Sequence, residues 1–162
     1  MTKCMQCGHA MTTKRENVPY KSLPGTVLVG VEVSRCPQCG ETEVAIPAIE
    51  KLNRVLAAAV VRKLGRLNGG EIRFLRTYLG LSGSDFADVI QSDKATVSRW
   101  ESDKQQIGHH ADLLLRTLVM LDKKVEKYPL EDFKKITDQQ VKSNYAVTLS
   151  SKREWQSTGV AA

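Results

Sequence analysis

The four cysteines of the chain form two Cys-x-x-Cys pairs, Cys4 with Cys7 and Cys36 with Cys39. A turn of this kind points two thiolates at one spot, and the glycine that follows each pair relieves its tight backbone. Four sulfur ligands suit a tetrahedral zinc ion, and a site with four protein ligands leaves no position open for water. The spacing therefore predicts one structural Zn²⁺ rather than a catalytic one.

A redox pair or free structural thiols are the alternatives, but a redox motif needs only one Cys-x-x-Cys pair. We expect a cytoplasmic protein, because the first ten residues lack the apolar segment of a signal peptide. The longest apolar run, Val55–Val61, is far short of the ~20 residues that span a bilayer, so no membrane contact is expected. Disulfides are rare in the cytosol, which also favours metal binding by the cysteines.

A second group of candidate residues lies between positions 71 and 103, where apolar residues recur at helical spacing. Ser82, with an acidic residue three positions later, predicts a capping box at the start of a second helix. Asp93 predicts the start of a third helix, which should run from Lys94 to about Glu101. Three short helices with this spacing are typical of a helix-turn-helix.

The third helix should present Lys94, Ala95, Thr96 and Arg99 outward. In a helix-turn-helix, residues at the start of the recognition helix meet base edges in the major groove. Arg99 can pair with guanine through two hydrogen bonds, Ala95 and Thr96 can contact a thymine methyl group, and Lys94 can reach a base or a phosphate. The net charge of +6 also favours a nucleic-acid partner. The alternative is that these are solvated residues of a short helix.

This block resembles the Cro/repressor-type (XRE-like) helix-turn-helix family. The matching residues are Arg76, Leu79-Gly80-Leu81-Ser82, Phe86-Ala87 and Thr96-Val97-Ser98-Arg99-Trp100-Glu101. The resemblance implies an ion pair between Arg76 and Glu101 that ties the first helix to the third. It also places Ser82 and Gly83 at the phosphate-contacting start of the second helix. Gly83 stands where the family usually has Gln, and Gln91 replaces the usual Gly between the second and third helices.

The fold class predicted is α+β, with a small four-cysteine zinc module of short strands and a helix, then an all-α helix-turn-helix domain. Strands are expected at Thr12–Val18 and Val27–Val33, and a helix at 48–67. The glycine pair at 69–70 would cap that helix and act as a flexible joint. The predicted parts are a zinc-binding domain (1–67), a hinge (68–70), the helix-turn-helix domain (71–128) and a partly disordered C-terminal extension (129–162).

Two further elements are expected in the extension, a short helix at Leu130–Ile136 and a strand at Tyr145–Leu149 that can add to a partner's sheet. Residues 150–162 are expected to be loose. A helix from about Gly108 to Lys127 has a wider apolar face than one side of a small core needs. Either part of it pairs with a second copy, giving a homodimer through the C-terminal domain, or it is fully buried.

The order of the two parts resembles the MqsA-type (YgiT-type zinc finger) antitoxin family of bacteria, over roughly residues 1–125. The resemblance rests on Cys4-Met5-Gln6-Cys7-Gly8, Cys36-Pro37-Gln38-Cys39-Gly40 and the block from Ile72 to Glu101. It implies a repressor that binds a palindromic operator in double-stranded DNA, and so lies on the nucleoid. It also implies that the zinc domain neutralises a protein toxin, often an mRNA-cleaving ribonuclease.

Ala95 stands where the best-known family pattern has an Asn that reads a base, so the DNA target is not carried over. The alternative function is a stand-alone zinc-containing regulator without a toxin partner. An enzyme is not expected, because the sequence has no Gly-rich phosphate loop, no nucleophile with a nearby base and no open metal position.

Overall fold

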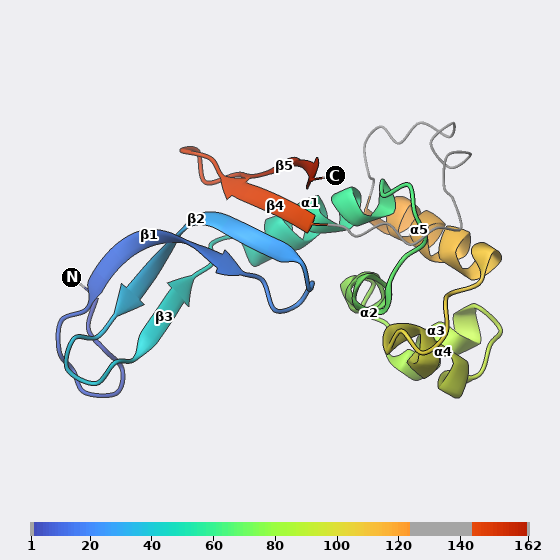
Figure 1. Cartoon of the computed structure of the whole chain (residues 1–162), viewed down its shortest axis with the longest axis horizontal. Helices are drawn as coiled ribbons and strands as arrows, with labels where there is room; N and C mark the ends of the chain where they lie inside the picture. The colour runs from blue at the N-terminus through green and yellow to red at the C-terminus, as the bar shows by residue number, and fades with distance from the viewer. Residues whose placement is uncertain (1, 124–143, 162) are drawn as a thin grey trace.

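The computed structural model describes residues 2–123 and 144–161, and this part of the chain is α+β (Figure 1). The strands are β1 (Thr12–Pro19), β2 (Thr26–Arg35), β3 (Thr42–Ala45), β4 (Asn144–Leu149) and β5 (Trp155–Ala161). The helices are α1 (Ile49–Val61), α2 (Gly69–Tyr78), α3 (Gly83–Val89), α4 (Lys94–Glu101) and α5 (His109–Lys123). No helix in these residues is both long enough and apolar enough to cross a membrane.

The strands form one sheet in the order β1-β2-β4-β5, with β2 at its centre. β1 runs antiparallel to β2 along one edge of that strand. Along the other edge of β2, residues 32–35 pair with β3 and residues 26–29 pair in parallel with β4. Because β3 and β4 share this edge end to end, the last described strands of the chain join the sheet built by its first residues.

The C-terminal strands differ in part from the prediction. The strand expected at Tyr145–Leu149 is present as β4, but it pairs with β2 of its own chain. The expectation that residues 150–162 are loose is wrong for 155–161, which form β5 against β4. The physical reason is burial: Trp155 is only 4% exposed, and its indole Nε1 donates to the Pro47 carbonyl oxygen, 2.8 Å away. The helix expected at Leu130–Ile136 lies outside the described residues.

One hydrophobic core joins the sheet to the helices. Helix α1 contacts β4 and β5 on one side and α2 and α5 on the other, as its course in Figure 1 indicates. Its apolar residues at three- and four-residue spacing supply the buried face. The core residues with no exposed surface include Leu28 and Val31 of β2, Leu52, Leu56 and Val60 of α1, Leu75 of α2, Leu115 of α5 and Val147 of β4.

The segment between α1 and α2 is not built as expected. Helix α1 ends at Val61 instead of 67, and the glycine pair at 69–70 does not cap it. Asn68 instead caps α2 in a capping box with Glu71, so both glycines belong to the first turn of α2. A Cβ on Gly69 would lie 2.5 Å from the Glu101 carbonyl oxygen, so this glycine allows α2 and α4 to pack closely.

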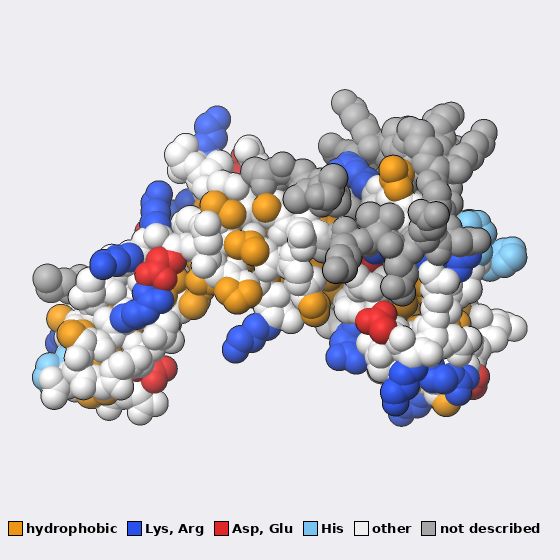
Figure 2. All heavy atoms as spheres, in the orientation of Figure 1, with side chains coloured by type: hydrophobic (Ala, Val, Ile, Leu, Met, Phe, Trp, Pro, Cys, Tyr) orange, Lys and Arg blue, Asp and Glu red, His pale blue; other side chains and the backbone are white. Residues whose placement is uncertain are grey.

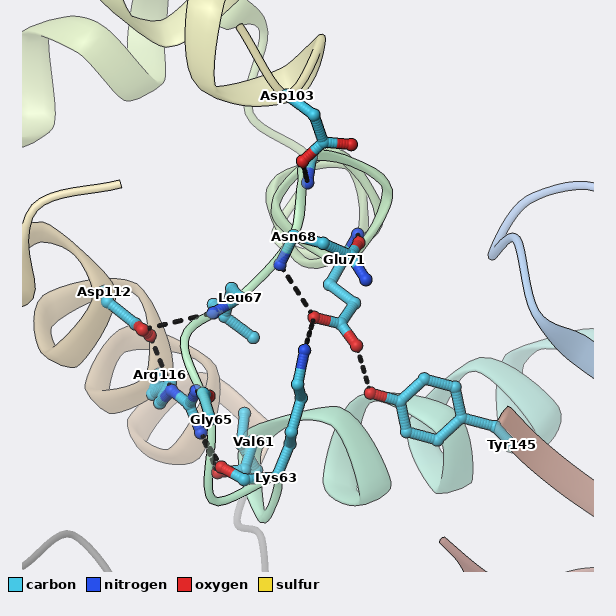
Figure 3. Close-up of polar contacts among 11 residues, drawn as sticks. Val61, Lys63, Gly65, Leu67, Asn68, Glu71, Asp103, Asp112, Arg116 and Tyr145 are labelled. Carbon is cyan, nitrogen blue, oxygen red and sulfur yellow. Dashed lines mark hydrogen bonds and ion pairs between the residues drawn. The ribbon is translucent and has the colours of Figure 1, made fainter. Parts of the chain in front are cut away.

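A buried carboxylate joins three parts of the chain at this point (Figure 3). Glu71 is 0% exposed. Its Oε2 accepts from Lys63 Nζ at 2.8 Å and from the Asn68 backbone amide at 2.9 Å, and its Oε1 accepts from the Tyr145 hydroxyl. A buried charge is tolerated only when it is paired and hydrogen-bonded. Lys63 supplies the opposite charge for Glu71, and the other two partners supply further hydrogen bonds.

A buried arginine holds the other side of the same segment (Figure 3). Arg116 of α5 is 0% exposed, and its Nε lies 2.6 Å from Asp112 Oδ1. Its terminal nitrogens donate to the carbonyl oxygens of Val61, Lys63 and Gly65 at 2.6–2.9 Å. The segment from 61 to 71 is therefore fixed by hydrogen bonds to α5 on one side and to β4 on the other.

Candidate functional site

The four cysteine sulfurs gather at the end of the sheet that lies away from the helices. Their Sγ atoms all lie within 4.8 Å of one another, and this group could hold one metal ion. The Cys7 sulfur lies 3.4 Å from that of Cys36, and the Cys4 sulfur lies 3.6 Å from that of Cys39. Each close contact therefore joins one Cys-x-x-Cys pair to the other.

Strand pairing brings the two pairs together. The first pair precedes β1, the second lies between β2 and β3, and the antiparallel register sets Thr12 opposite Arg35. Each pair forms the same kind of turn, in which the amide of the following glycine donates to the carbonyl of the first cysteine. Gly8 and Gly40 have φ values of 74° and 76°, which glycine adopts at little cost.

The backbone of the second turn also acts on its sulfur atoms. Amide hydrogen bonds from Cys39 and then Gln38, with a bond to Cys7, lower the pKa of Cys36 to about 6, although burial opposes this. The Glu41 amide lowers the pKa of Cys39, but burial and the neighbouring thiols outweigh it and raise that pKa to about 12. Four cysteine sulfurs fit a soft or borderline divalent metal such as zinc, which binds cysteine in its deprotonated form.

The tip of the sheet around the cysteines is packed separately from the main core. Its buried cluster consists of Cys4, Met11 and Cys36, whereas Cys7 and Cys39 are exposed. So small a cluster buries little apolar surface compared with the core around α1. A metal ion that joined the four sulfurs would crosslink the two turns where apolar packing is thin.

The second candidate site is the exposed side of α4. Its buried side holds Val97 and Trp100, which pack into the main core. Lys94, Ala95 and Arg99 are exposed and Thr96 is half-buried, so the structure brings the four predicted residues together on one short helix. Figure 2 shows Lys and Arg side chains gathered over the part of the molecule that α3 and α4 form.

Both helix starts predicted from capping residues are present. Ser82 caps α3 in a capping box with Asp85, and the Asp93 carboxylate accepts from the Thr96 amide at the start of α4. Gly83 is the first residue of α3, and a Cβ there would meet nothing within 4 Å. Gln91, between the two helices, has a φ of 53°, the left-handed conformation that usually favours glycine.

Charged residues tie α4 to α2. Arg76 Nε lies 2.5 Å from Glu101 Oε1, and Arg76 Nη1 donates to the Leu81 carbonyl oxygen at 2.7 Å. The arginine therefore contacts both α4 and the turn before α3. Arg73, which the sequence interpretation missed, lies 3.3 Å from Glu101 Oε2. Arg73 lies one helical turn before Arg76, and this spacing could have indicated that both arginines contact Glu101.

The sequence interpretation also missed Gln105. Its Oε1 accepts from Arg99 Nε at 3.0 Å, although Gln105 lies beyond the end of α4. No helical periodicity relates the two residues, so nothing in the sequence pattern pointed to this contact.

Helix α5 divides the apolar residues that suggested a dimer. Leu115 and Val119 are fully buried in the main core. Leu114 and Leu121 are exposed, Leu121 by 75%. One side of α5 therefore packs into the core, and another side exposes a few apolar side chains.

A comparison with known proteins found no matching protein-family model, no matching curated protein and no matching solved structure.

Proposed function

We propose that this chain is a sequence-specific DNA-binding transcriptional repressor in which α2, α3 and α4 form a helix-turn-helix. The observation that carries the proposal is the two-sided character of α4. Val97, Trp100 and the Arg76–Glu101 pair fix one side to the protein, while Lys94, Ala95 and Arg99 face solvent. A short helix held in this way can enter the major groove and present those side chains to base edges.

The phosphate contacts proposed for Ser82 and Gly83 rest on the resemblance to the Cro/repressor-type family. Gly83 has no side chain to bind a phosphate, so its contribution would come from its backbone. Lys94 and Lys104 flank the exposed face of α4 in the sequence and add positive charge beside it. Lysine contacts with phosphates supply affinity that depends on salt and not on sequence.

One structural zinc ion is proposed at Cys4, Cys7, Cys36 and Cys39. The four sulfur atoms lie close enough for one ion, and their donor type suits zinc. Four thiolates would fill the tetrahedral positions, which leaves no place for a catalytic water. The ion would then hold the two cysteine turns together and would take no part in a reaction.

We further propose that the protein is the antitoxin of a type II toxin–antitoxin pair that neutralises an mRNA-cleaving toxin and represses its own operon. This rests on the order of zinc module and helix-turn-helix in the sequence. A homodimer through the C-terminal helices, with Leu114 and Leu121 at the contact, would match a palindromic operator. The alternative is a stand-alone regulator, which the β4–β5 pair favours because it lies outside the segment of resemblance.

DNA binding is tested by titrating the full chain against the DNA upstream of its own reading frame and against a scrambled duplex. We expect the upstream DNA to bind at least tenfold more tightly. Arg99→Ala should remove that preference, while Lys152→Ala, an exposed change in the β4–β5 turn, should leave it unchanged. Equal binding of both duplexes by the unaltered protein would refute the proposed repression of its own operon.

The antitoxin role has a separate test in living cells. The adjacent reading frame is expressed alone and together with this chain, and growth is followed. Arrest by the neighbour and recovery on co-expression would support the antitoxin. A harmless neighbour would leave the stand-alone regulator as the better proposal.

A further inference from the structure

Arg99 is held against its own helix by hydrogen bonds on two sides. Its Nη2 donates to Thr96 Oγ1 at 2.5 Å, and its Nε donates to Gln105 Oε1 at 3.0 Å. Thr96 lies one turn earlier on α4, whereas Gln105 lies beyond the end of the helix. An exposed arginine usually samples many rotamers, so two such contacts fix the plane of this guanidinium.

The Thr96 end of this arrangement is itself anchored. The Thr96 hydroxyl donates its proton to Asp93 Oδ2 at 2.6 Å, and Asp93 Oδ1 accepts from the Thr96 amide at 2.8 Å. The hydroxyl therefore has its lone pairs left to accept from Arg99. The same hydrogen bonds lower the pKa of Asp93, which keeps this carboxylate ionised at neutral pH.

The Gln105 end is anchored through the backbone. The amides of Lys104 and Gln105 both donate to the Arg99 carbonyl oxygen, at 2.9 and 3.2 Å. Asp103, with a φ of 56°, turns the chain back, and its Oδ1 accepts from the Gly69 amide at 2.7 Å. The turn that carries Gln105 is therefore fixed to both α4 and the start of α2.

The contacts with Thr96 and Gln105 use two of the five N–H protons of the guanidinium and leave three for a further partner. Nη1 makes no hydrogen bond to any residue in the described part of the chain, and Nη2 has a second proton beyond the one given to Thr96. These two nitrogens form the edge that pairs with the O6 and N7 acceptors of guanine. The third nitrogen, Nε, donates its proton to Gln105.

We infer that Gln105 and Thr96 are positioning residues that hold Arg99 ready to read a guanine in the operator half-site. This inference rests on the proposed DNA-binding function and adds residues that determine its specificity. A side chain ordered before binding loses less conformational entropy on binding. This role is compatible with the contact predicted for Thr96, since its hydroxyl accepts from Arg99 while its methyl group can still contact a thymine methyl group.

The test begins with selection of binding sites from a random double-stranded DNA library by the full-length protein. The dissociation constant is then measured for the selected site and for the same site with each guanine changed to adenine. Gln105→Met removes the acceptor at nearly constant side-chain length, and Gln106→Met is the matched control one residue later. Arg99→Lys removes the planar edge itself.

At one guanine of the half-site, Gln105→Met should reduce the guanine-over-adenine preference by about threefold to tenfold, the worth of one hydrogen bond. Arg99→Lys should abolish that preference, and Gln106→Met should leave it unchanged. Affinity for non-specific DNA and its salt dependence should stay the same in Gln105→Met. Thermal unfolding of each variant checks that the fold is retained.

Failure of the proposed DNA-binding function and failure of the positioning role would give different results. If the unaltered protein selects no sequence, the proposed function is wrong. If it selects a site whose guanine preference Gln105→Met leaves intact, the positioning role is wrong while the function stands. If Gln105→Met weakens all duplexes equally, Gln105 contacts the DNA backbone itself and the positioning inference is overturned.

Discussion

The Tyr145 hydroxyl donates a hydrogen bond to the buried Glu71 carboxylate and so joins β4 to the first turn of α2 across 74 positions of sequence (Figure 3). Lys63 Nζ and the Asn68 amide donate to the same carboxylate. The orientation of the sheet relative to the helices is thus set by a contact that requires the C-terminal strands.

Tyr145→Phe tests this contact because it removes one hydroxyl and little volume. A hydrogen bond to a charged group contributes about 1.5–3 kcal/mol, so the free energy of unfolding should fall by about that amount. Tyr20→Phe is the control, since its hydroxyl donates to the neutral Asn53 side chain at 2.9 Å and should matter less. Urea unfolding followed by circular dichroism measures both, and equal losses would count against a special role for Tyr145.

Lys63→Met tests the ion pair itself. Both side chains are almost fully buried, and removing one partner would leave the Glu71 charge with fewer donors. Breaking a buried pair in this way costs about 3–5 kcal/mol. Arg15→Met is the control, because its 4.0 Å contact with Glu32 is exposed and should contribute little. Comparable losses in the two variants would show that burial does not determine the effect.

Gly69→Ala should separate α2 from α4. The added Cβ would lie 2.5 Å from the Glu101 carbonyl oxygen and 2.7 Å from that of Trp100, so the backbone must shift. We expect lower stability and weaker specific DNA binding. Gly83→Ala is the matched change in a helix with open space around it, and it should stabilise the protein by up to about 1 kcal/mol. A Gly69→Ala variant as stable as the unaltered protein would contradict the close packing.

The local features of this molecule were predictable and the long-range ones were not. Ser82, Asp93 and the Cys-x-x-Cys turns act within a few residues, so their spacing alone indicated helix starts and a four-cysteine group. Glu71 and Tyr145 meet only after the sheet has formed, and no sequence pattern relates them. The glycine pair at 69–70 misled the interpretation because glycine serves both flexible joints and close helix packing.

Acid should weaken the start of α4. The pKa of Asp93 is lowered by hydrogen bonds from the Thr96 hydroxyl and amide, with a smaller effect of the Arg99 charge. Its stabilising contribution is therefore complete above the ordinary aspartate pKa and is lost as the pH falls through the lowered value. The stability difference between the unaltered protein and Asp93→Ala should shrink between neutral pH and pH 2. A constant difference would show that the charge of Asp93 does not matter.

Removal of the proposed metal should loosen the tip of the sheet and leave the core. The cysteine cluster packs apart from the main core, which runs without interruption from the sheet through α1 to α5. We therefore expect a chelator, or Cys36→Ser with Cys39→Ser, to raise hydrogen exchange in residues 2–11 and 36–41 only. The amides of α1 and α2 should stay protected, since Glu71 and Arg116 hold them through contacts far from the sulfurs.

The predicted zinc-binding domain (1–67), separated by a hinge from the rest, implies a wider effect in which that whole domain unfolds by itself. The shared core favours an effect that is limited to the two cysteine turns, because α1 packs against β4, β5, α2 and α5 at once. Met5→Ser, a change of an exposed side chain within the first turn, is the control and should not alter exchange in the second turn. Loss of protection throughout α1 with α2 intact would instead support the predicted division into two domains, because only then could the zinc-binding domain unfold by itself.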